Sequence, residues 1–401
     1  MSEVSAENAY RLVTGEAAEL LIDVGEHPVA HKFLASQDAP ETLFPIRLGV
    51  GKNSGLVGLI DPPDWPSITP IYSWIQINEP EDHLDDLVSQ VTGLLTHVSE
   101  GAELSILGLS EKDSSTLARF NALGFTQTEL FSHPKLAGQV KPGVEVVQAA
   151  ISEPLPAEVA QLKKYDVIIG RHILEHTWET QAFLNNVVAM LSQEGVALLE
   201  VPDNEKAFKD VQHTIIWEEH SLYFTQNTLV DLLARYGLQV ERIIRYPMAL
   251  EDILVAVLKR SDGDTKSLTV SDVRDAELTA HFQQRFLPMQ QFFQQKLEAY
   301  KMQYGGVAIL GAGHLGAAFV NYYGLADVID VVIDDDPNKQ GLFMPGCRLP
   351  IVGSNKLRDG TYRFCLLTCN PWNNEKIVAR NQAFIESGGV FLSIFQPETW
   401  S

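Results

Sequence analysis

Cysteine is nearly absent from this chain. Of 401 residues only Cys347, Cys365 and Cys369 are cysteines, all near the C-terminus, and the last two fall in the apolar stretch FCLLTC. Three cysteines cannot form a disulfide framework, nor a four-cysteine zinc site unless histidines substitute. We therefore expect buried thiols and no metal centre.

Basic side chains and long apolar segments are also scarce. The 30 lysines and arginines are outnumbered by 52 acidic residues, which gives a net charge of −22. Such a charge repels phosphate backbones, so we expect no nucleic-acid partner, and a bound nucleotide would need a local basic or backbone-amide site. No apolar run approaches the roughly 20 residues of a membrane span, and the start MSEVSAENAY lacks a signal-peptide pattern. We expect a cytoplasmic protein with no membrane contact; a protein partner stays open.

The length predicts two or three domains. The pattern divides into a small, irregular N-terminal lobe (1–83), an α/β domain (84–262), a helical connector (263–304) and a second α/β domain (305–401). The predicted fold class is therefore α/β. In the first lobe we expect a helix at Ala6–Thr14 and a strand within LLIDVGEHPVAHKF.

The centre of the chain is Tyr165–Phe224. An apolar strand at Asp166–Ile169, a helix at Thr180–Leu191 and a second apolar strand at Val196–Val201 predict a βαβ unit in a parallel sheet. Ligands of such sheets bind beyond the C-terminal ends of the strands. The polar residues expected at these ends, and in the loop that follows, are Arg171, His172, Glu175, His176, Asp203, Asn204, Glu218, Glu219 and His220.

Before this unit, strand Leu104–Leu107 and helix Ser115–Leu123 flank the loop where a nucleotide-binding domain places its glycines. Only Gly108 is present there, and Glu111 and Asp113 would repel a phosphate or carboxylate. The loop argues against a conventional dinucleotide site. The other elements that we predict are strands Phe125–Phe131, Val144–Ala149, Gln239–Tyr246 and Ile253–Lys259, helix Thr225–Tyr236 and the long helix Val273–Tyr304.

The last domain begins with a glycine-rich turn. Gly311, Gly313 and Gly316 follow strand Val307–Leu310, and Asp334 stands about 20 residues further on, where a ribose carboxylate belongs. This pattern predicts contact with a nucleotide or sugar nucleotide, NAD included; the alternative is a turn that serves only helix packing. With about 100 residues the domain is half a dinucleotide fold, which weakens the prediction of a full NAD site.

Several segments together resemble a known family. They are DVGEHPVAHKF, HILEHTWETQAFLNNVVAMLSQEGVALLEVPD, EEHSLYF, DPNKQGLFMPGCRLPIV and CNPWNN. In order and spacing the chain resembles the S-adenosylmethionine-dependent sugar C-methyltransferases, which act on dTDP-linked keto-deoxysugars. The resemblance implies a zinc-bearing N-terminal lobe, a central class I methyltransferase-like Rossmann domain and a C-terminal half-Rossmann domain. It also implies a histidine base that removes the proton next to the sugar ketone, after which the enolate attacks the sulfonium methyl group.

The resemblance assigns roles residue by residue. His220 would be the base, Glu219 its hydrogen-bonding neighbour, His176 a polar group lining the site, and Tyr72 a hydroxyl over the sugar. For Tyr72 the alternative is packing against a neighbouring domain. The residues expected to bind the methyl donor are Gly108, His172 and, at its ribose, Glu129.

The chain departs from the family at three places. The zinc cysteines are missing, Trp217 replaces an aromatic hydroxyl, and the donor loop reads GLSEKDS after Ile106. The sequence therefore leaves three functions open: an active sugar C-methyltransferase, a degenerate homologue that binds sugar nucleotides or acts as a scaffold, and an NAD-dependent sugar-nucleotide oxidoreductase. The Tyr-x-x-x-Lys pair that often serves such oxidoreductases does not follow Asp334.

Overall fold

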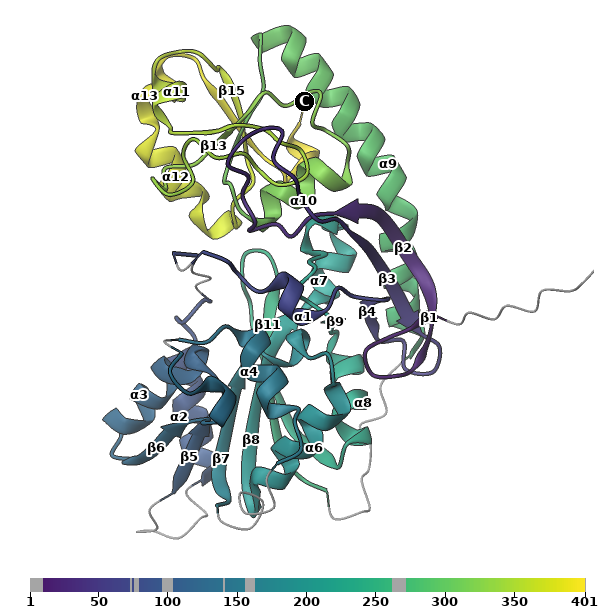
Figure 1. Ribbon diagram of the computed structural model, residues 1–401, viewed down its shortest axis with the longest axis vertical. Helices are drawn as coiled ribbons and strands as arrows, with labels where there is room; N and C mark the ends of the chain where they lie inside the picture. Colours follow the sequence, from purple (N-terminus) through teal and green to yellow (C-terminus); the bar gives the residue numbers. More distant parts are fainter. Residues whose placement is uncertain are drawn as a thin grey trace, which may run out of the picture.

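The structure is a computed structural model. It describes residues 10–72, 74–75, 79–95, 104–139, 141–155, 163–261 and 272–400, with side chains from 275 onward in the last range. The central and C-terminal sheets lie at opposite ends of the long axis, and the N-terminal strands and a long helix run beside the junction between them (Figure 1). In the described part of the chain, no helix has the length and apolarity needed to cross a bilayer.

The central domain is a six-stranded sheet with the order β10-β11-β8-β7-β5-β6. Only β11 runs antiparallel to its neighbours. The strands are β5 (Ser105–Gly108), β6 (Gln127–Leu130), β7 (Tyr165–Arg171), β8 (Leu191–Asp203), β10 (Leu238–Tyr246) and β11 (Asp252–Arg260). The predicted α/β class with a central Rossmann-type domain is confirmed.

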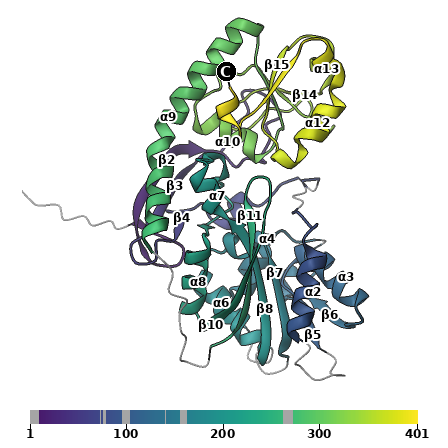
Figure 2. The ribbon, with the colours of Figure 1, turned by 180° about the vertical axis from the view of Figure 1, so that it is seen from behind.

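Alternation along the buried strands explains why helices cover both faces. In β7, Val167 and Ile169 pack in the cluster that contains helices α2 (Leu84–Leu95) and α3 (Ser114–Ala122). Ile168 points the other way, into the cluster with α6 (Thr180–Met190) and α8 (Gln226–Arg235). Successive strand residues face opposite sides, so a strand buried on both sides has to be apolar throughout. Figure 2 shows α2 and α3 together on one side of this sheet.

Two predicted elements differ in the structure. Val144–Ala149, expected as a strand, is the start of helix α4 (Val144–Ile151), in which Val147, Ala150 and Ile151 are buried with helical spacing. A short apolar run does not distinguish a buried helix from a strand. Of the helix expected at Ala6–Thr14, residues 6–9 lie outside the described ranges, and strand β1 (Tyr10–Arg11) occupies part of the rest.

The N-terminal sheet is completed by a strand from far along the chain. Its order is β1-β2-β3-β4-β9, with β2 (Ala17–His27), β3 (Phe44–Gly51) and β4 (Val57–Leu59) followed by β9 (Leu222–Tyr223). Gly58 pairs with Leu222, and a Cβ at Gly58 would lie 2.7 Å from the carbonyl oxygen of Ser221. In the sequence, the short helix α1 (Trp65–Ile68) follows β4, and the short helix α7 (Asn204–Lys209) precedes β9.

The C-terminal domain is a five-stranded parallel sheet, β14-β13-β12-β15-β16. Its strands are β12 (Ala308–Leu310), β13 (Val331–Ile333), β14 (Ile351–Val352), β15 (Phe364–Leu367) and β16 (Val390–Ser393); its helices are α10 (His314–Tyr322), α11 (Asn355–Arg358), α12 (Asn374–Arg380) and α13 (Gln382–Glu386). Helix α9 (Asp272–Tyr304) precedes it, close to the predicted bounds. Phe282 of α9 packs with the N-terminal sheet and Phe293 with the C-terminal domain, so the helix connects the two.

Candidate functional site

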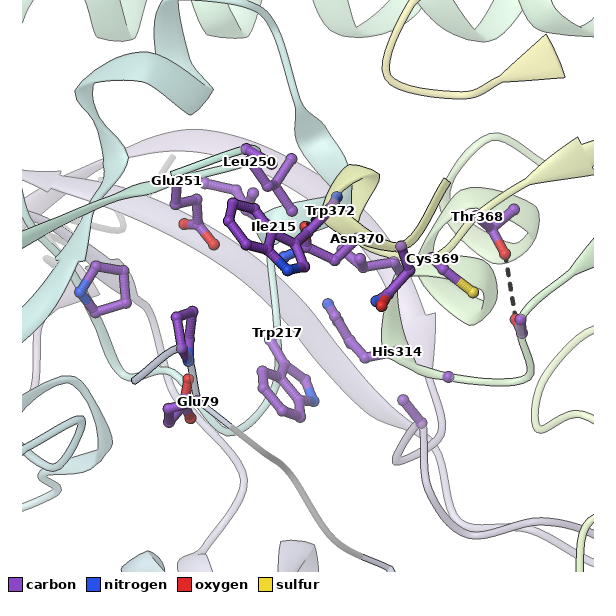
Figure 3. A pocket seen from close by; sticks show the side chains of 18 of the residues that line it. Glu79, Ile215, Trp217, Leu250, Glu251, His314, Thr368, Cys369, Asn370 and Trp372 are labelled. Atoms are coloured by element: carbon purple, nitrogen blue, oxygen red, sulfur yellow. Dashed lines mark hydrogen bonds between the residues drawn. The ribbon is translucent and has the colours of Figure 1, made fainter. Parts of the chain in front are cut away.

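A cavity of about 970 Å³ lies where the three sheets meet. Its wall combines the N-terminal segment, the ends of the central strands and the glycine-rich turn of the last domain. Figure 3 shows a part of this lining, with Trp217, His314 and Trp372 around its middle. The lining residues used below are Glu79, Pro80, His172, Trp217, His220, Glu251, Gly311, Gly313, His314, Lys339 and Trp372.

His220 lies on this wall, in the loop just before β9. Its backbone N–H donates to Trp217 O at 3.0 Å, which fixes the turn, and its ring meets those of His176 and Trp217 at centroid distances of 4.7 and 5.0 Å. Burial lowers the pKa of His220 well below 6.5, and the nearby His176 lowers it further. His220 is therefore a neutral imidazole at pH 7, able to accept a proton from a molecule in the cavity.

A buried layer of paired carboxylates and imidazoles lies behind His220. His31 Nδ1 is 2.9 Å from Glu219 Oε1, and His176 Nδ1 is 3.3 Å from Glu145 Oε1. Burial and the charge of Glu145 raise the pKa of Glu219 to about 8. Ligand atoms of Glu145, His176 and Glu219 lie within 4.8 Å of one another, a donor set that could hold one metal ion. Each carboxylate lies close to an imidazole, but His31 Nδ1, His176 Nδ1 and Glu219 Oε1 have no hydrogen-bond partner among the described residues.

The glycine-rich turn forms another part of the cavity wall. Gly311 has φ 122°, and a Cβ there would lie 2.6 Å from Cys369 Sγ. Gly316 packs against the turn, whereas Gly313 faces open space and precedes α10 without a side-chain cap. The first N–H groups of α10 therefore remain available to an anion. Asp334 accepts from Ala312 N–H at 2.9 Å and from Lys339 Nζ at 3.1 Å, so it braces the turn.

The loop expected to bind the methyl donor does not reach the cavity. Two of its amide groups are bonded within the loop: Ser110 N–H donates to Asp113 Oδ2 at 2.8 Å, and Asp113 N–H donates to Ser110 O at 3.0 Å. Asp113 Oδ1 also accepts from the N–H of Arg171, at the end of β7, at 2.9 Å. Burial raises the pKa of Asp113 to about 7. A Cβ on Gly108 would lie 2.8 Å from Asp113 Cβ, so this glycine serves the packing of its own loop.

Charged side chains occupy the space next to this loop. The Arg171 side chain, 1% exposed, donates to Glu200 Oε1 at 3.0 Å, to Lys112 O at 2.8 Å and to Pro80 O at 3.0 Å. Lys112 Nζ lies 2.6 Å from Glu79 Oε1. We call Glu79, Lys112, Arg171 and Glu200 the ionic plug.

His172 borders the ionic plug and shares its charge. Its Nε2 lies 3.1 Å from Glu200 Oε1, and its Nδ1 lies 3.1 Å from Glu175 Oε1. Burial alone would lower the pKa of His172, but the carboxylates of Glu79, Glu175 and Glu200 raise it to about 10. His172 is thus a cation held by the protein's own carboxylates.

These residues do not fit S-adenosylmethionine in the manner of the family. The loop offers no unbonded glycine turn, and the ionic plug fills the space beside it. Glu129, expected at the ribose, accepts from Tyr165 Oη at 2.7 Å and pairs with Lys163. Glu129 is not among the residues that line the cavity.

The structure thus brings some predicted residues together and separates others. His220, His172, Gly311 and Gly313 line one cavity, and His176 and Glu219 lie behind His220. Tyr72 donates to Phe33 O at 3.1 Å and stacks on Trp74, which lines the cavity. Gly108 and Glu129 lie apart from the cavity. Gly316 and Asp334 support the glycine-rich turn.

Sequence reasoning missed three residues of the site. Glu251 projects from the turn between β10 and β11, and its carboxyl accepts from Asn204 Nδ2 at 2.6 Å. Burial raises the pKa of Glu251 to about 7. Glu79 and Glu145 belong to no motif either; the one available signal for Glu145 was a charge within an otherwise apolar stretch, VEVVQAAI.

Comparison with known families matches two parts of the chain. Residues 267–395 match the family described as "C-methyltransferase C-terminal domain", and residues 109–243 match "Methyltransferase domain". C-methyltransferase NovU from Streptomyces niveus is 24% identical over 93% of this chain and 91% of its own length. The predicted resemblance to S-adenosylmethionine-dependent C-methyltransferases is confirmed at this level.

Two solved structures each match about half of the chain. LepI in complex with SAM is 16% identical, with a TM-score of 0.33, over 46% of this chain and 50% of LepI. The 1,6-didemethyltoxoflavin-N1-methyltransferase of Burkholderia thailandensis, with bound S-adenosylhomocysteine, is 14% identical, with a TM-score of 0.29, over 53% of this chain and 98% of its own. These values carry no argument about the site.

Proposed function

We propose that this chain, a relative of the S-adenosylmethionine-dependent C-methyltransferases, is an enzyme that acts on a nucleotide-linked keto-deoxysugar with His220 as its base. The observation that carries the proposal is a neutral imidazole and a glycine-rich turn that line the same cavity. The first feature suits removal of a proton next to a ketone, and the second suits a diphosphate.

The geometry supports an assignment for each part of the substrate. The diphosphate binds the N–H groups at the start of α10, which has no side-chain cap; Lys339 lies on the same wall and is paired with Asp334. Trp217 and Trp372 also line the cavity, and their apolar aromatic faces suit contact with a deoxysugar. The sugar ring then lies beside His220.

His220 performs the first chemical step. It accepts the proton from the carbon next to the ketone, and the electron pair of that C–H bond enters the enolate. The buried layer of Glu219, His31, His176 and Glu145 holds polar groups behind the base, where the charge of the protonated imidazole develops. In the family, the enolate carbon then receives the methyl group of S-adenosylmethionine.

Methylation of a dTDP-linked keto-deoxyhexose is the reaction to assay first. The enzyme, the sugar nucleotide and S-adenosylmethionine are incubated, and a methylated product is sought by mass spectrometry. His220→Gln should lower turnover of the sugar roughly 10²-fold or more, because the general base is lost. His281→Gln, an exposed histidine on α9, is the matched control and should leave turnover unchanged. Unaltered turnover by His220→Gln would exclude His220 as the base.

One observation favours a second candidate function. The ionic plug and the bonded donor loop favour an enzyme that uses the same substrate and base without a methyl donor.

The glycine-rich turn keeps the third possibility, an NAD-dependent oxidoreductase, open to a direct test. If that turn holds NAD, binding of NAD, measured by calorimetry, should be lost in Gly313→Val.

A further inference from the structure

We propose that this protein turns over its keto-sugar by proton transfer alone, as an epimerase at the carbon next to the ketone, with His220 as base and Glu251 as acid. The substrate and the base rest on the proposed function. The inference replaces the methyl donor with a proton donor that belongs to the chain.

The first support is that paired charged side chains, the ionic plug, occupy the space beside the loop that was expected to bind the methyl donor. The plug's main contacts are an Arg171–Glu200 pair at 3.0 Å and a Lys112–Glu79 pair at 2.6 Å, and Arg171 also closes the loop through two backbone carbonyls. Opening this space would leave these charged groups without their partners, which is unfavourable.

The second support is a proton donor on the wall of the same cavity. Glu251 comes from the β10–β11 turn, whereas His220 comes from the loop before β9, so the two groups reach the cavity from different elements. Figure 3 shows the carboxyl group of Glu251 pointing into the pocket. Asn204 holds this carboxyl in place, and its raised pKa of about 7 keeps a large fraction protonated at neutral pH.

The reaction balances without any other reactant. His220 takes the proton, the C–H bond breaks, and its electron pair forms the enolate. Glu251 then gives its proton to the same carbon, a new C–H bond forms, and the ketone is restored. A proton returned to the opposite face yields the epimer; afterwards His220 loses a proton to water and Glu251 gains one. No atom other than hydrogen is exchanged.

The test is solvent exchange without a methyl donor. The full-length protein and a dTDP-linked keto-deoxyhexose are mixed in D₂O, and deuterium uptake and configuration are followed by NMR. We expect deuterium at the carbon next to the ketone, together with the epimer. His220→Gln should abolish both signals. Glu251→Gln should retain deuterium uptake through His220 but reduce epimer formation roughly 10²-fold. His281→Gln and Glu277→Gln, which replace exposed residues of α9, should behave as wild type.

Calorimetry with S-adenosylmethionine and S-adenosylhomocysteine completes the test. We expect no heat of binding up to about 1 mM, which bounds the affinity at roughly −4 kcal/mol. Binding followed by methylation of the sugar would overturn the inference and leave the proposed function standing. Binding of the sugar nucleotide with neither deuterium uptake nor methylation would overturn both the inference and the assignment of His220. Equal epimer formation by wild type and Glu251→Gln would overturn the role of Glu251.

Discussion

Breaking the Lys112–Glu79 pair tests whether the ionic plug, beside the loop expected to bind the methyl donor, stabilises the folded protein. Glu79→Gln removes the only carboxylate that lies within ion-pair distance of Lys112 among the described residues. It also removes the carboxylate 3.8 Å from His172 Nε2. Lys112→Met is milder, because Glu79 keeps His172 as a partner. Breaking a buried pair costs about 3–5 kcal/mol. Since these side chains are 20% and 21% exposed, we expect about 3 kcal/mol for Glu79→Gln and about 2 kcal/mol for Lys112→Met.

Equilibrium unfolding in urea, followed at the central domain, measures these costs. The double variant should lose clearly less than the sum of the single variants, because each partner's penalty is the charge left by the other. The neighbouring positive charges lower the pKa of Glu79 from 4.5, against the effect of burial. Its contribution is therefore present above about pH 4.5 and is lost as the pH falls through the lower folded value. Additive costs, or a difference from wild type that persists in strong acid, would refute the reasoning.

Three further predictions concern stability. Gly316→Ala should cost roughly 1–3 kcal/mol in urea unfolding, because its Cβ would lie 2.4 Å from Gly311 O, whereas Gly313→Ala meets nothing within 4 Å and should stay within about 0.5 kcal/mol. Thr225→Ala removes the capping box of α8 and should cost about 1 kcal/mol by the same measurement; no loss would contradict the cap. Burial lowers the pKa of His213 to about 4, so its neutral form favours the folded state and stability should fall between about pH 6.5 and 4; His213→Phe should flatten that part of a stability–pH curve.

Much of the central fold could be predicted because its signals are local. The apolar runs around Ile168 and Leu198 favoured strands buried on both faces, and Thr225 indicated the start of α8. The error at Val144–Ala149 has an equally local cause. Eight residues are too few for period alone to decide, and the charge of Glu145 is explained only by its distant partner His176.

The site was less predictable because its decisive contacts join distant residues. His220 could be identified from its motif, but its neutral state depends on its burial at the cavity wall, which distant parts of the chain form together. Lys112 and Glu79 are 33 positions apart, and Arg171 and Glu200 are 29 apart. No spacing rule connects such pairs. The scarcity of glycine in the loop after β5 indicated an altered site for the methyl donor. The charged side chains beside that loop are seen only in the structure.

The pairing of β4 with β9 makes the strands within residues 10–59 part of the support of the loop that carries His220. β9 begins two residues after His220, and Gly58 and Leu222 lie side by side in one sheet. A fragment starting at residue 84 would contain the whole central sheet and still lack the edge on which His220 rests. The part of the chain that has to be expressed to keep the His220 loop in place is consequently larger than the central sheet and includes the N-terminal strands.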